Sequence, residues 1–370
     1  MTPKVIAHYL PQFHDVTENN LWWWEGFTEW TNVKKAQPLY DWHTQPRTPL
    51  DGKYYNILDK DTRAWQAKIA KEYGIDGFCY YHYWFKWGKL LLEKPMEQFL
   101  LDGEPNIPFC FCWGNGNWAR TWEGQPEQIL MLQEYGDETD WRKHFEYLLP
   151  FFQSDLYIRK EGRSVFLIHY SKHMQEVIEP MLQKWNQWAQ EKGIPEFYFV
   201  EVMSSSQHIP YAPSSSAVLE FHPLHALKNN LSVRFIPMII KHLYNRFHKW
   251  MTNRGFFINS ISYQTIWEVI LKRGKKRILE YWDRDIIDGG FVSWDNSPRK
   301  GKDSLIVTGS SPEMFRAYFW RQYARAVEDG VDFVFLNAWN EWAEWAYLEP
   351  DTLHTYWYLE AIRSIKDTHA

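Results

Sequence analysis

Two glutamates near the end of the chain have the residue type and the spacing that acid–base chemistry needs. Glu341 and Glu344 stand three residues apart among aromatic residues, directly after the apolar run 331–336. Apolar neighbours raise a carboxyl pKa, and a second carboxylate nearby pushes the two pKa values apart. Such a pair can hold one acid and one base at the same pH, as chemistry at a glycosidic bond requires. The plainer interpretation is a pair of solvated surface charges, against which the tryptophan-rich flanks weigh.

These glutamates need a framework, and the chain contains eight short apolar runs separated by stretches of helical periodicity. Alternation of strand and helix repeated eight times predicts an α/β fold, a (β/α)8 TIM barrel, as a single domain over residues 1–370. Active sites in this fold lie where strands end and the following loops begin. The runs are 5–9, 77–83, 108–113, 164–169, 197–202, 217–221, 290–294 and 333–336.

Polar and aromatic residues gather where these runs end. Any one of them alone is more readily explained as a core or rim group, but their coincidence at six or more strand ends indicates a binding site. Beside the two glutamates, the residues that we expect to contact a substrate are His14, His82, Trp84, Trp113, Asn115, Trp118, Glu201, Glu220, Trp294, Asp295, Arg299, Asn337, Trp339 and Asn340.

The composition limits the classes of partner. Hydrophobic residues make up 45% of the 370 residues, which is enough for a large core, and the net charge of −5 gives no sign of nucleic-acid binding. Aromatic residues make up 18%, and 23 of them are Trp. Because indole rings stack on the C–H faces of sugars, this content is compatible with a carbohydrate partner, although Trp can also simply fill a large core.

The cysteines and the N-terminus bear on the compartment. Cys79, Cys110 and Cys112 all fall in strand-like runs, and so small and odd a number argues against a disulfide framework. The chain enters a strand-like segment at once, without a signal-peptide pattern, and no apolar run is long enough to span a bilayer. We therefore expect a cytoplasmic protein.

Two connections are long. Residues 10–60 are expected to fold over the site as a lid. Residues 224–289 read as a basic helical insertion, with eleven Lys or Arg residues and one acidic residue between positions 228 and 277. This insertion is either a solvated helical segment, a peripheral contact with an anionic membrane, or a contact with an acidic glycan or pyrophosphate-linked substrate.

Other site chemistries lack their motifs. The chain has no Gly-x-x-x-x-Gly-Lys-Ser/Thr run, no strand-linked Gly-x-Gly-x-x-Gly and no Gly-x-Ser-x-Gly elbow. His8, His14, His43 and His82 do not have the spacing of a metal motif. We therefore predict neither a metal nor a cofactor.

Several motifs together resemble the WbsX-type proteins, which belong to a group similar to glycoside hydrolase family 99. The resemblance runs over nearly the whole chain. It is carried by segments 8–14, 26–33, 45–47, 77–85, 294–296 and 337–344.

The resemblance implies a barrel that cleaves internal α-mannosidic bonds with retention and without a cofactor. It implies that Glu341 is the base that deprotonates the sugar 2-hydroxyl, whose oxygen then attacks the anomeric carbon to give an anhydro-sugar. It also implies that Glu344 protonates the leaving oxygen and afterwards activates water. This path has no covalent enzyme intermediate, unlike the usual two-carboxylate scheme.

Two positions depart from the pattern. The hydrolases usually have His between the two glutamates, where this chain has Ala343. WbsX-type chains commonly have Glu where this chain has Gly116, so a carboxylate expected in the site is missing. Glu29 or Glu123 are the candidates to replace it, and altered specificity or reduced activity would follow from its loss.

The favoured function is a retaining α-glycoside hydrolase acting on an oligosaccharide or polysaccharide. The alternative is a glycosyltransferase in lipopolysaccharide, O-antigen or capsule assembly, against which stands the lack of a nucleotide-sugar fold and of an Asp-x-Asp motif. A third interpretation is a non-catalytic glycan-binding barrel, which Gly116 supports.

Overall fold

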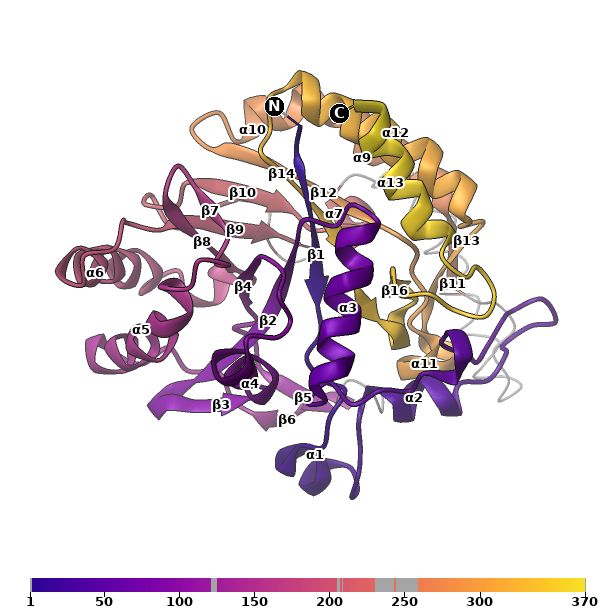
Figure 1. Ribbon diagram of the computed structural model, residues 1–370, viewed down its shortest axis with the longest axis horizontal. Coiled ribbons are helices and arrows are strands. Elements are labelled where there is room, and N and C mark those ends of the chain that lie inside the picture. The colour runs from indigo at the N-terminus through magenta and orange to yellow at the C-terminus, as the bar shows by residue number, and fades with distance from the viewer. Residues whose placement is uncertain are drawn as a thin grey trace.

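In the computed structural model, eight parallel strands close into one ring (Figure 1). The structure describes residues 2–120, 125–204, 207, 209–229, 243 and 259–369. The first strand pairs with both the second and the last, so the sheet has no open edge in the ring and the predicted (β/α)8 barrel is confirmed. The ring consists of β1 (Lys4–Tyr9), β2 (Gly77–Phe85), β4 (Phe109–Trp113), β8 (Arg163–Ile168), β9 (Tyr198–Met203), β10 (Ala217–Glu220), β12 (Asp285–Phe291) and β14 (Phe333–Asn337).

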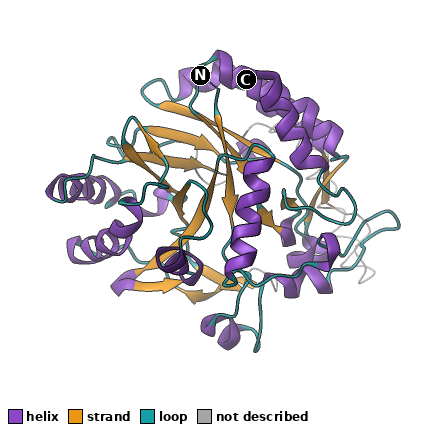
Figure 2. Cartoon of the chain, in the orientation of Figure 1, coloured by secondary structure: helices purple, strands orange, loops and turns teal. Residues whose placement is uncertain are grey.

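Helices surround the strands, which occupy the centre of the view in Figure 2. Because helices cover the outer face of a parallel barrel and side chains fill its inside, the strands are apolar on both faces. Every residue of β4, β9 and β14 is accordingly buried. The helices are α1 (Thr17–Trp22), α2 (Glu29–Lys35), α3 (Lys60–Glu72), α4 (Lys94–Asp102), α5 (Glu138–Phe152), α6 (Ile178–Glu191), α7 (Leu224–Asn229), α9 (Tyr263–Lys272), α10 (Gly274–Glu280), α11 (Ser297–Lys300), α12 (Pro312–Glu328) and α13 (Trp357–His369).

Several short strands and 3-10 turns lie outside the ring. The minor strands are β3 (Lys89–Leu91), β5 (Trp118–Arg120), β6 (Gln125–Met131), β7 (Arg159–Lys160), β11 (Asn259–Ser262), β13 (Leu305–Thr308), β15 (Asn340–Glu341) and β16 (Ala346–Tyr347). The 3-10 turns are η1 (Leu50–Gly52), η2 (Lys86–Gly88), η4 (Ser171–Met174), η5 (Gly301–Asp303) and η6 (Trp342–Glu344).

The seventh ring strand lies earlier than the sequence predicts. The prediction was 290–294, whereas β12 begins at Asp285. Its first half contains Asp285 and Asp288, which pair with cationic side chains of neighbouring elements. Acidic residues paired in this way do not belong to an apolar pattern, so the pattern marks only the end of the strand.

The two long connections are only partly as expected. Residues 10–60 form α1, α2 and η1. In the predicted basic insertion, α7, β11, α9 and α10 are described, whereas 230–242 and 244–258 lie outside the described residues. The proposed membrane contact through 228–277 falls largely on that part. Among the described helices, none combines the length and the apolar character needed to cross a bilayer.

Candidate active site

Both candidate glutamates lie in the turn that follows β14. Glu341 ends β15, and Glu344 ends the 3-10 turn η6. The amide of Asn340 ties this turn to the segment after β1, because its Oδ1 accepts from the Leu10 N–H at 2.7 Å and its Nδ2 donates to the Leu10 carbonyl at 3.1 Å. Asn340 is fully buried and both ends of its amide are used. Asn340 therefore positions the glutamates. The sequence predicts it as a substrate contact, but it is not among the residues that line the cavity described below.

One guanidinium, that of Arg299 on α11, contacts three carboxylates. Its Nη1 lies 2.5 Å from Glu344 Oε1, and its Nη2 lies 2.9 Å from Glu341 Oε2. Its Nη2 also lies 2.5 Å from Oε1 of Glu29, the first residue of α2. Such bonds are charge-assisted, and the planar guanidinium fixes the direction of each partner. Both candidate catalytic groups are thus held by the same side chain.

Burial and the neighbouring charges shift the pKa values of two of these carboxyl groups, Glu341 and Glu29. Burial raises the pKa of Glu341 to about 8; Arg299 opposes this rise, and the neighbouring Glu344 and Glu29 add to it. Burial likewise raises the pKa of Glu29, again against the effect of Arg299. A carboxyl group with a pKa near the working pH can take up and release a proton, as a general acid or base must.

Asp295 connects this cluster to the N-terminal connection. Its Oδ2 accepts from Gln45 Nε2 at 3.0 Å and lies 2.7 Å from His43 Nε2, while its Oδ1 accepts from the backbone N–H of Ser297 at 2.8 Å. Its own N–H donates to the carbonyl of Glu344 at 2.7 Å. With its carboxylate buried and bonded in this way, Asp295 orients α11, and it is not among the residues that line the cavity described below.

A cavity of about 250 Å³ opens beside Glu341 and Glu344 at the carboxyl ends of the strands. Its walls are mainly aromatic, and among the described lining residues there is no Lys or Arg. An aromatic cavity with a few polar groups suits a sugar, since rings stack on its C–H faces while the polar groups bind hydroxyls. It is lined by Tyr81, Tyr83, Gly114, Gly116, Asn117, Trp118, His169, Tyr170, Phe221, Leu224, Trp294, Asn337, Glu341 and Glu344.

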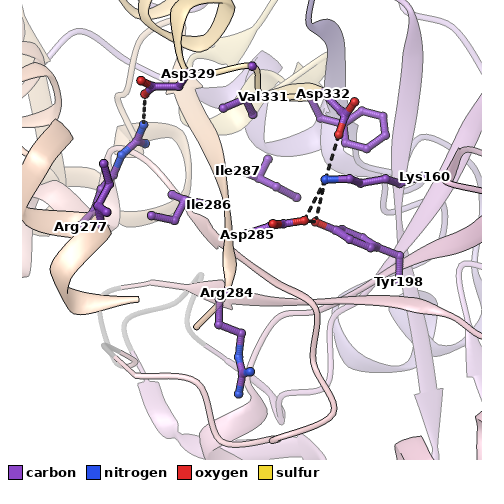
Figure 3. Close-up of a pocket in the computed structure, with 13 residues that line it drawn as sticks. Lys160, Tyr198, Arg277, Arg284, Asp285, Ile286, Ile287, Asp329, Val331 and Asp332 are labelled. Carbon is purple, nitrogen blue, oxygen red and sulfur yellow. Dashed lines mark hydrogen bonds and ion pairs between the residues drawn. The ribbon is translucent and has the colours of Figure 1, made fainter. Parts of the chain in front are cut away.

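A second cavity, of about 320 Å³, lies where β9, β12 and β14 begin (Figure 3). There Lys160 Nζ lies between Asp285 and Asp332, at 2.8 and 2.9 Å from their Oδ2 atoms. Arg277 faces Asp329 at 3.8 Å. These charges neutralise one another, and the amino ends of barrel strands are the end that serves stability. The cavity beside the glutamates is therefore the candidate active site.

The predicted residues divide into those that line the cavity and those that do not. Five of them line it, namely Trp118, Trp294, Asn337, Glu341 and Glu344. Arg299 contacts both glutamates. The sequence-based expectation thus brings together residues from the ends of three different ring strands, β4, β12 and β14.

The side chains of β2 that line the cavity are not the ones that the sequence predicts. His82 and Trp84 were expected in the site, yet they point outward and pack on His144 of α5, with 2.8 Å between the Nε2 atoms of His82 and His144. Tyr81 and Tyr83 line the cavity instead. Successive side chains of a strand point to opposite faces, so a shift of one residue exchanges the two sets.

Glu201 and Glu220, which the sequence predicts as substrate contacts, are not among the residues that line the cavity. The carboxylate of Glu201 is buried and accepts from the backbone N–H groups of Tyr211 and Ala212 at 2.7 and 3.0 Å. Glu220 is buried too, and its Oε1 lies 2.5 Å from Arg273 Nη2. Glu201 lies within β9 and Glu220 ends β10, and both carboxylates bond to groups outside the cavity.

Four further residues predicted for the site are likewise not among those that line the cavity. His14 is buried outside the cavity, and burial lowers its pKa to about 4. Trp113 and Trp339 are buried core residues. Asn115 receives the backbone N–H of Tyr170 at 2.7 Å and donates to its carbonyl at 3.1 Å, so it positions an aromatic wall of the cavity.

Tyr170 packs against Gly116, the position where the carboxylate is missing. A Cβ added at Gly116 would lie 3.0 Å from Tyr170 Cε2, so the ring occupies the space that a side chain at Gly116 would enter. Glu29, one of the two residues considered as a replacement, does reach the cluster, through Arg299. Glu123 lies outside the described residues.

The connection 10–60 reaches the site through Glu29, and none of its residues is among those that line the cavity. The connection therefore does not cover the cavity as a lid; it holds Arg299 in place through Glu29. The sequence does not reveal the contact of Glu29 with Arg299, because an acidic residue in the first turn of a helix already has a local role there.

The family model described as "Glycosyltransferase WbsX" matches residues 5–362. The "Uncharacterized protein WxcX" of two strains of Xanthomonas campestris pv. campestris is 32% identical over 362 residues, which cover 97% of this chain and 49% of the relative. The chain therefore spans about half the length of these relatives.

Solved structures share the barrel at low sequence identity. A "Glycoside hydrolase-like protein" superposes with a TM-score of 0.61 at 12% identity, covering 98% of this chain and 94% of that chain. The GH99 endo-alpha-mannosidase from Bacteroides thetaiotaomicron superposes with a TM-score of 0.52 at 12% identity, covering 98% and 96%. At this identity the likeness concerns the fold alone.

Proposed function

The chain belongs to the Glycosyltransferase WbsX family of carbohydrate-active proteins, and on the chemistry of its cavity we propose that it is a retaining α-glycoside hydrolase. The observation that carries the proposal is the pair Glu341 and Glu344, held by Arg299 at the mouth of an aromatic cavity. The endo-alpha-mannosidase among the barrels of similar fold directs the choice of bond toward an α-mannosidic or related linkage.

The proposed roles follow the family resemblance. Glu341 takes the proton of the sugar 2-hydroxyl, whose oxygen attacks the anomeric carbon, while Glu344 gives a proton to the leaving oxygen. Glu344 then takes a proton from water, which opens the anhydro-sugar, and Glu341 returns its proton to the 2-oxygen. The raised pKa of Glu341 supports this role, because a carboxylate with a higher pKa is the stronger base once ionised.

The aromatic walls supply binding and orientation. Tyr81 and Tyr83 on β2 and Tyr170 after β8 line the cavity. Ring stacking and a few hydroxyl contacts can hold one sugar ring against the two glutamates. Because no Lys or Arg lines the described part of the cavity, we propose an uncharged sugar at this position, whereas a uronic acid would meet two carboxylates.

A glycosyltransferase is the second candidate, and the family description favours it. In that case Glu341 would deprotonate an acceptor hydroxyl, and the leaving group would be a phosphate. A lipid-linked donor in polysaccharide assembly would suit such a reaction without a nucleotide-binding fold.

The experiment that separates these functions uses two substrate mixtures and mass spectrometry. One mixture holds α-linked mannose- and rhamnose-type oligosaccharides, and the other holds nucleotide sugars and lipid pyrophosphate-linked sugars with acceptor glycans. Shorter oligosaccharides in the first mixture establish the hydrolase. Extended acceptors in the second overturn it in favour of the transferase.

Two variants make the assay specific to the pair. Glu344→Gln should lower turnover by about 10²–10⁴-fold, the usual contribution of a general acid or base, and leave glycan affinity nearly unchanged. Glu360→Gln, an exposed glutamate of α13, is the matched control and should leave turnover intact. Glycan binding without turnover in the wild type and in both variants would instead identify a binding protein.

A further inference from the structure

Three side chains converge just after β10, on the side of the strand that faces the helices and not the cavity. They are Glu220, His222 and His225, all of them buried. His222 Nε2 lies 3.7 Å from Glu220 Oε2, and His225 Nδ1 lies 3.8 Å from the same oxygen. One donor atom from each of the three residues lies within 4.8 Å of the other two.

These distances suit a shared ion better than direct bonds. A hydrogen bond between nitrogen and oxygen spans about 2.7–3.2 Å, so neither imidazole bonds this oxygen. A tetrahedral ion with bonds of about 2.0–2.2 Å holds its donor atoms roughly 3.3 Å apart. The two measured distances from Glu220 Oε2 exceed that value by about half an ångström, which small rotations of the imidazoles would close.

The donor set is also the right one for a particular class of metal. Two imidazoles and one carboxylate form the set that commonly binds Zn²⁺, and imidazole nitrogens select such transition ions over Mg²⁺ or Ca²⁺. The segment 222–225 brings both histidines from one turn, and the strand end supplies the carboxylate. The predicted absence of a metal rested on four other histidines, and none of them belongs to this group.

Arg273 orients the carboxylate from the opposite side. Its Nη2 lies 2.5 Å from Glu220 Oε1, and its Nε donates to Oε1 at 3.0 Å and to Oε2 at 3.3 Å. Ligating carboxylates are commonly held in this way by a hydrogen-bonding partner; the two shorter contacts go to Oε1, and Oε2 keeps a lone pair for the metal. The positive charge of Arg273 would oppose a cation, but its Nη2 also lies 2.8 Å from Glu280 Oε2, so a second carboxylate offsets it.

We propose that Glu220, His222 and His225 form a binding site for a divalent transition-metal ion of the zinc type. The site lies next to the proposed active site without being part of it. Phe221 and Leu224 of the same turn line the cavity, and Asn337 Nδ2 donates to the carbonyl of His222 at 3.1 Å. An ion bound here fixes the turn that forms one wall of the cavity, so its role is structural.

Direct metal binding to the full chain tests the proposal without any assay of activity. The purified protein, freed of metal with a chelator, is titrated with Co²⁺ and followed by visible absorption, then with Zn²⁺ in competition. We expect one Co²⁺ per chain, the absorption of a low-symmetry site with nitrogen ligands, displacement by Zn²⁺, and a higher Tm with either ion. A wild-type protein that binds neither ion stoichiometrically overturns the proposal.

Variants assign the site to these residues. His222→Gln and His225→Gln keep the side chains polar and close in size but remove one imidazole each. Each should weaken Zn²⁺ binding at least tenfold, whereas His369→Gln, at the far end of α13, should leave it unchanged. Circular dichroism checks that the variants fold. Unchanged Zn²⁺ affinity in both folded variants would place the ion elsewhere and overturn the assignment.

Discussion

Two buried charge clusters of this barrel differ in the ratio of cations to carboxylates. In the Arg299 cluster, one guanidinium contacts Glu29, Glu341 and Glu344. In the Asp288 cluster, one carboxylate contacts two guanidinium groups, with 2.5 Å from its Oδ1 to Arg277 Nη1 and 2.5 Å to Arg325 Nη2. The first cluster adjoins the cavity, and the second ties β12 to α10 and α12.

The pKa values of the carboxyl groups follow this ratio. Burial alone would raise the pKa of Asp288, but Arg277 and Arg325 outweigh it, so the pKa lies below its usual value. Burial raises the pKa of Glu341 to about 8, because one Arg299 shared among three carboxylates does not outweigh it. Burial is thus common to both clusters, and the ratio decides which of them can exchange protons near neutral pH.

The two clusters also differ in how they can relieve an imbalance. Surplus carboxylates can take up protons, whereas surplus arginines cannot release them at any ordinary pH. Removing the charge at the centre of each cluster should therefore have different consequences. The following changes are ordered from the largest expected effect to the smallest.

Asp288→Asn should cost the most stability. It leaves Arg277 and Arg325 buried beside a neutral amide, and removal of one partner from a buried ion pair costs about 3–5 kcal/mol. Because arginine stays charged, the loss should be nearly equal at pH 5 and pH 8. Urea unfolding at the two pH values measures it, with Asp303→Asn, an exposed aspartate, as the control. A loss below about 1 kcal/mol would show that the two arginines are solvated in the native state.

Arg299→Met should cost less, about 2–3 kcal/mol at pH 8, and the cost should shrink as the pH falls. Without Arg299, the pKa values of Glu29 and Glu341 rise further in the folded state. Their folded pKa values then lie above the unfolded ones, so the folded protein binds more protons, and its stability increases as the pH falls from 8 toward 5.

The measurement is the same urea series, with Arg316→Met on the exposed face of α12 as the matched control. Recovery at low pH in Arg299→Met, together with no recovery in Asp288→Asn, would support the comparison. An equal loss of unfolding free energy at both pH values in Arg299→Met would contradict it, since the carboxylates would then not take up protons to reduce their mutual repulsion.

The contrast also indicates what the sequence can predict. The eight apolar runs predict the barrel because parallel strands buried on both faces leave a continuous apolar signal. The pair Glu341 and Glu344 is local in sequence, so its spacing is visible. The tie between Glu29 and Arg299 joins residues 270 positions apart, and no local pattern encodes it.

Two other errors have a physical origin as well. His82 and Trp84 were chosen in place of Tyr81 and Tyr83 because a strand that is apolar on both faces does not show which face is inside. Glu220 was placed in the cavity because a strand end is easy to locate in a sequence, while the direction of its last side chain depends on that same alternation.

The pH dependence of the proposed hydrolysis sharpens the role of Glu341. In the proposed step Glu341 must be ionised while Glu344 is protonated, so the pair carries one proton. The profile of kcat/KM should therefore be bell-shaped, and it should fall about tenfold per pH unit above pH 8, where the pair loses that proton. The profile is measured on the oligosaccharide that the mass-spectrometric assay identifies, with conductivity held constant. A profile that stays level above pH 8 instead would mean that neither carboxyl of the pair has to be protonated, and it would contradict the acid role of Glu344.

Lys160→Met should have the smallest effect and separates burial from charge ratio. Lys160 contacts two carboxylates, as Arg299 contacts three and Asp288 contacts two guanidinium groups. Its partners Asp285 and Asp332, however, have side chains that are 54% and 32% exposed (Figure 3). Water can therefore solvate both when the cation is removed, and such pairs contribute about 0.2–1 kcal/mol. The urea midpoint at pH 7 measures the loss. A loss as large as that of Asp288→Asn would mean that the number of partners, and not their burial, sets the energy of these clusters.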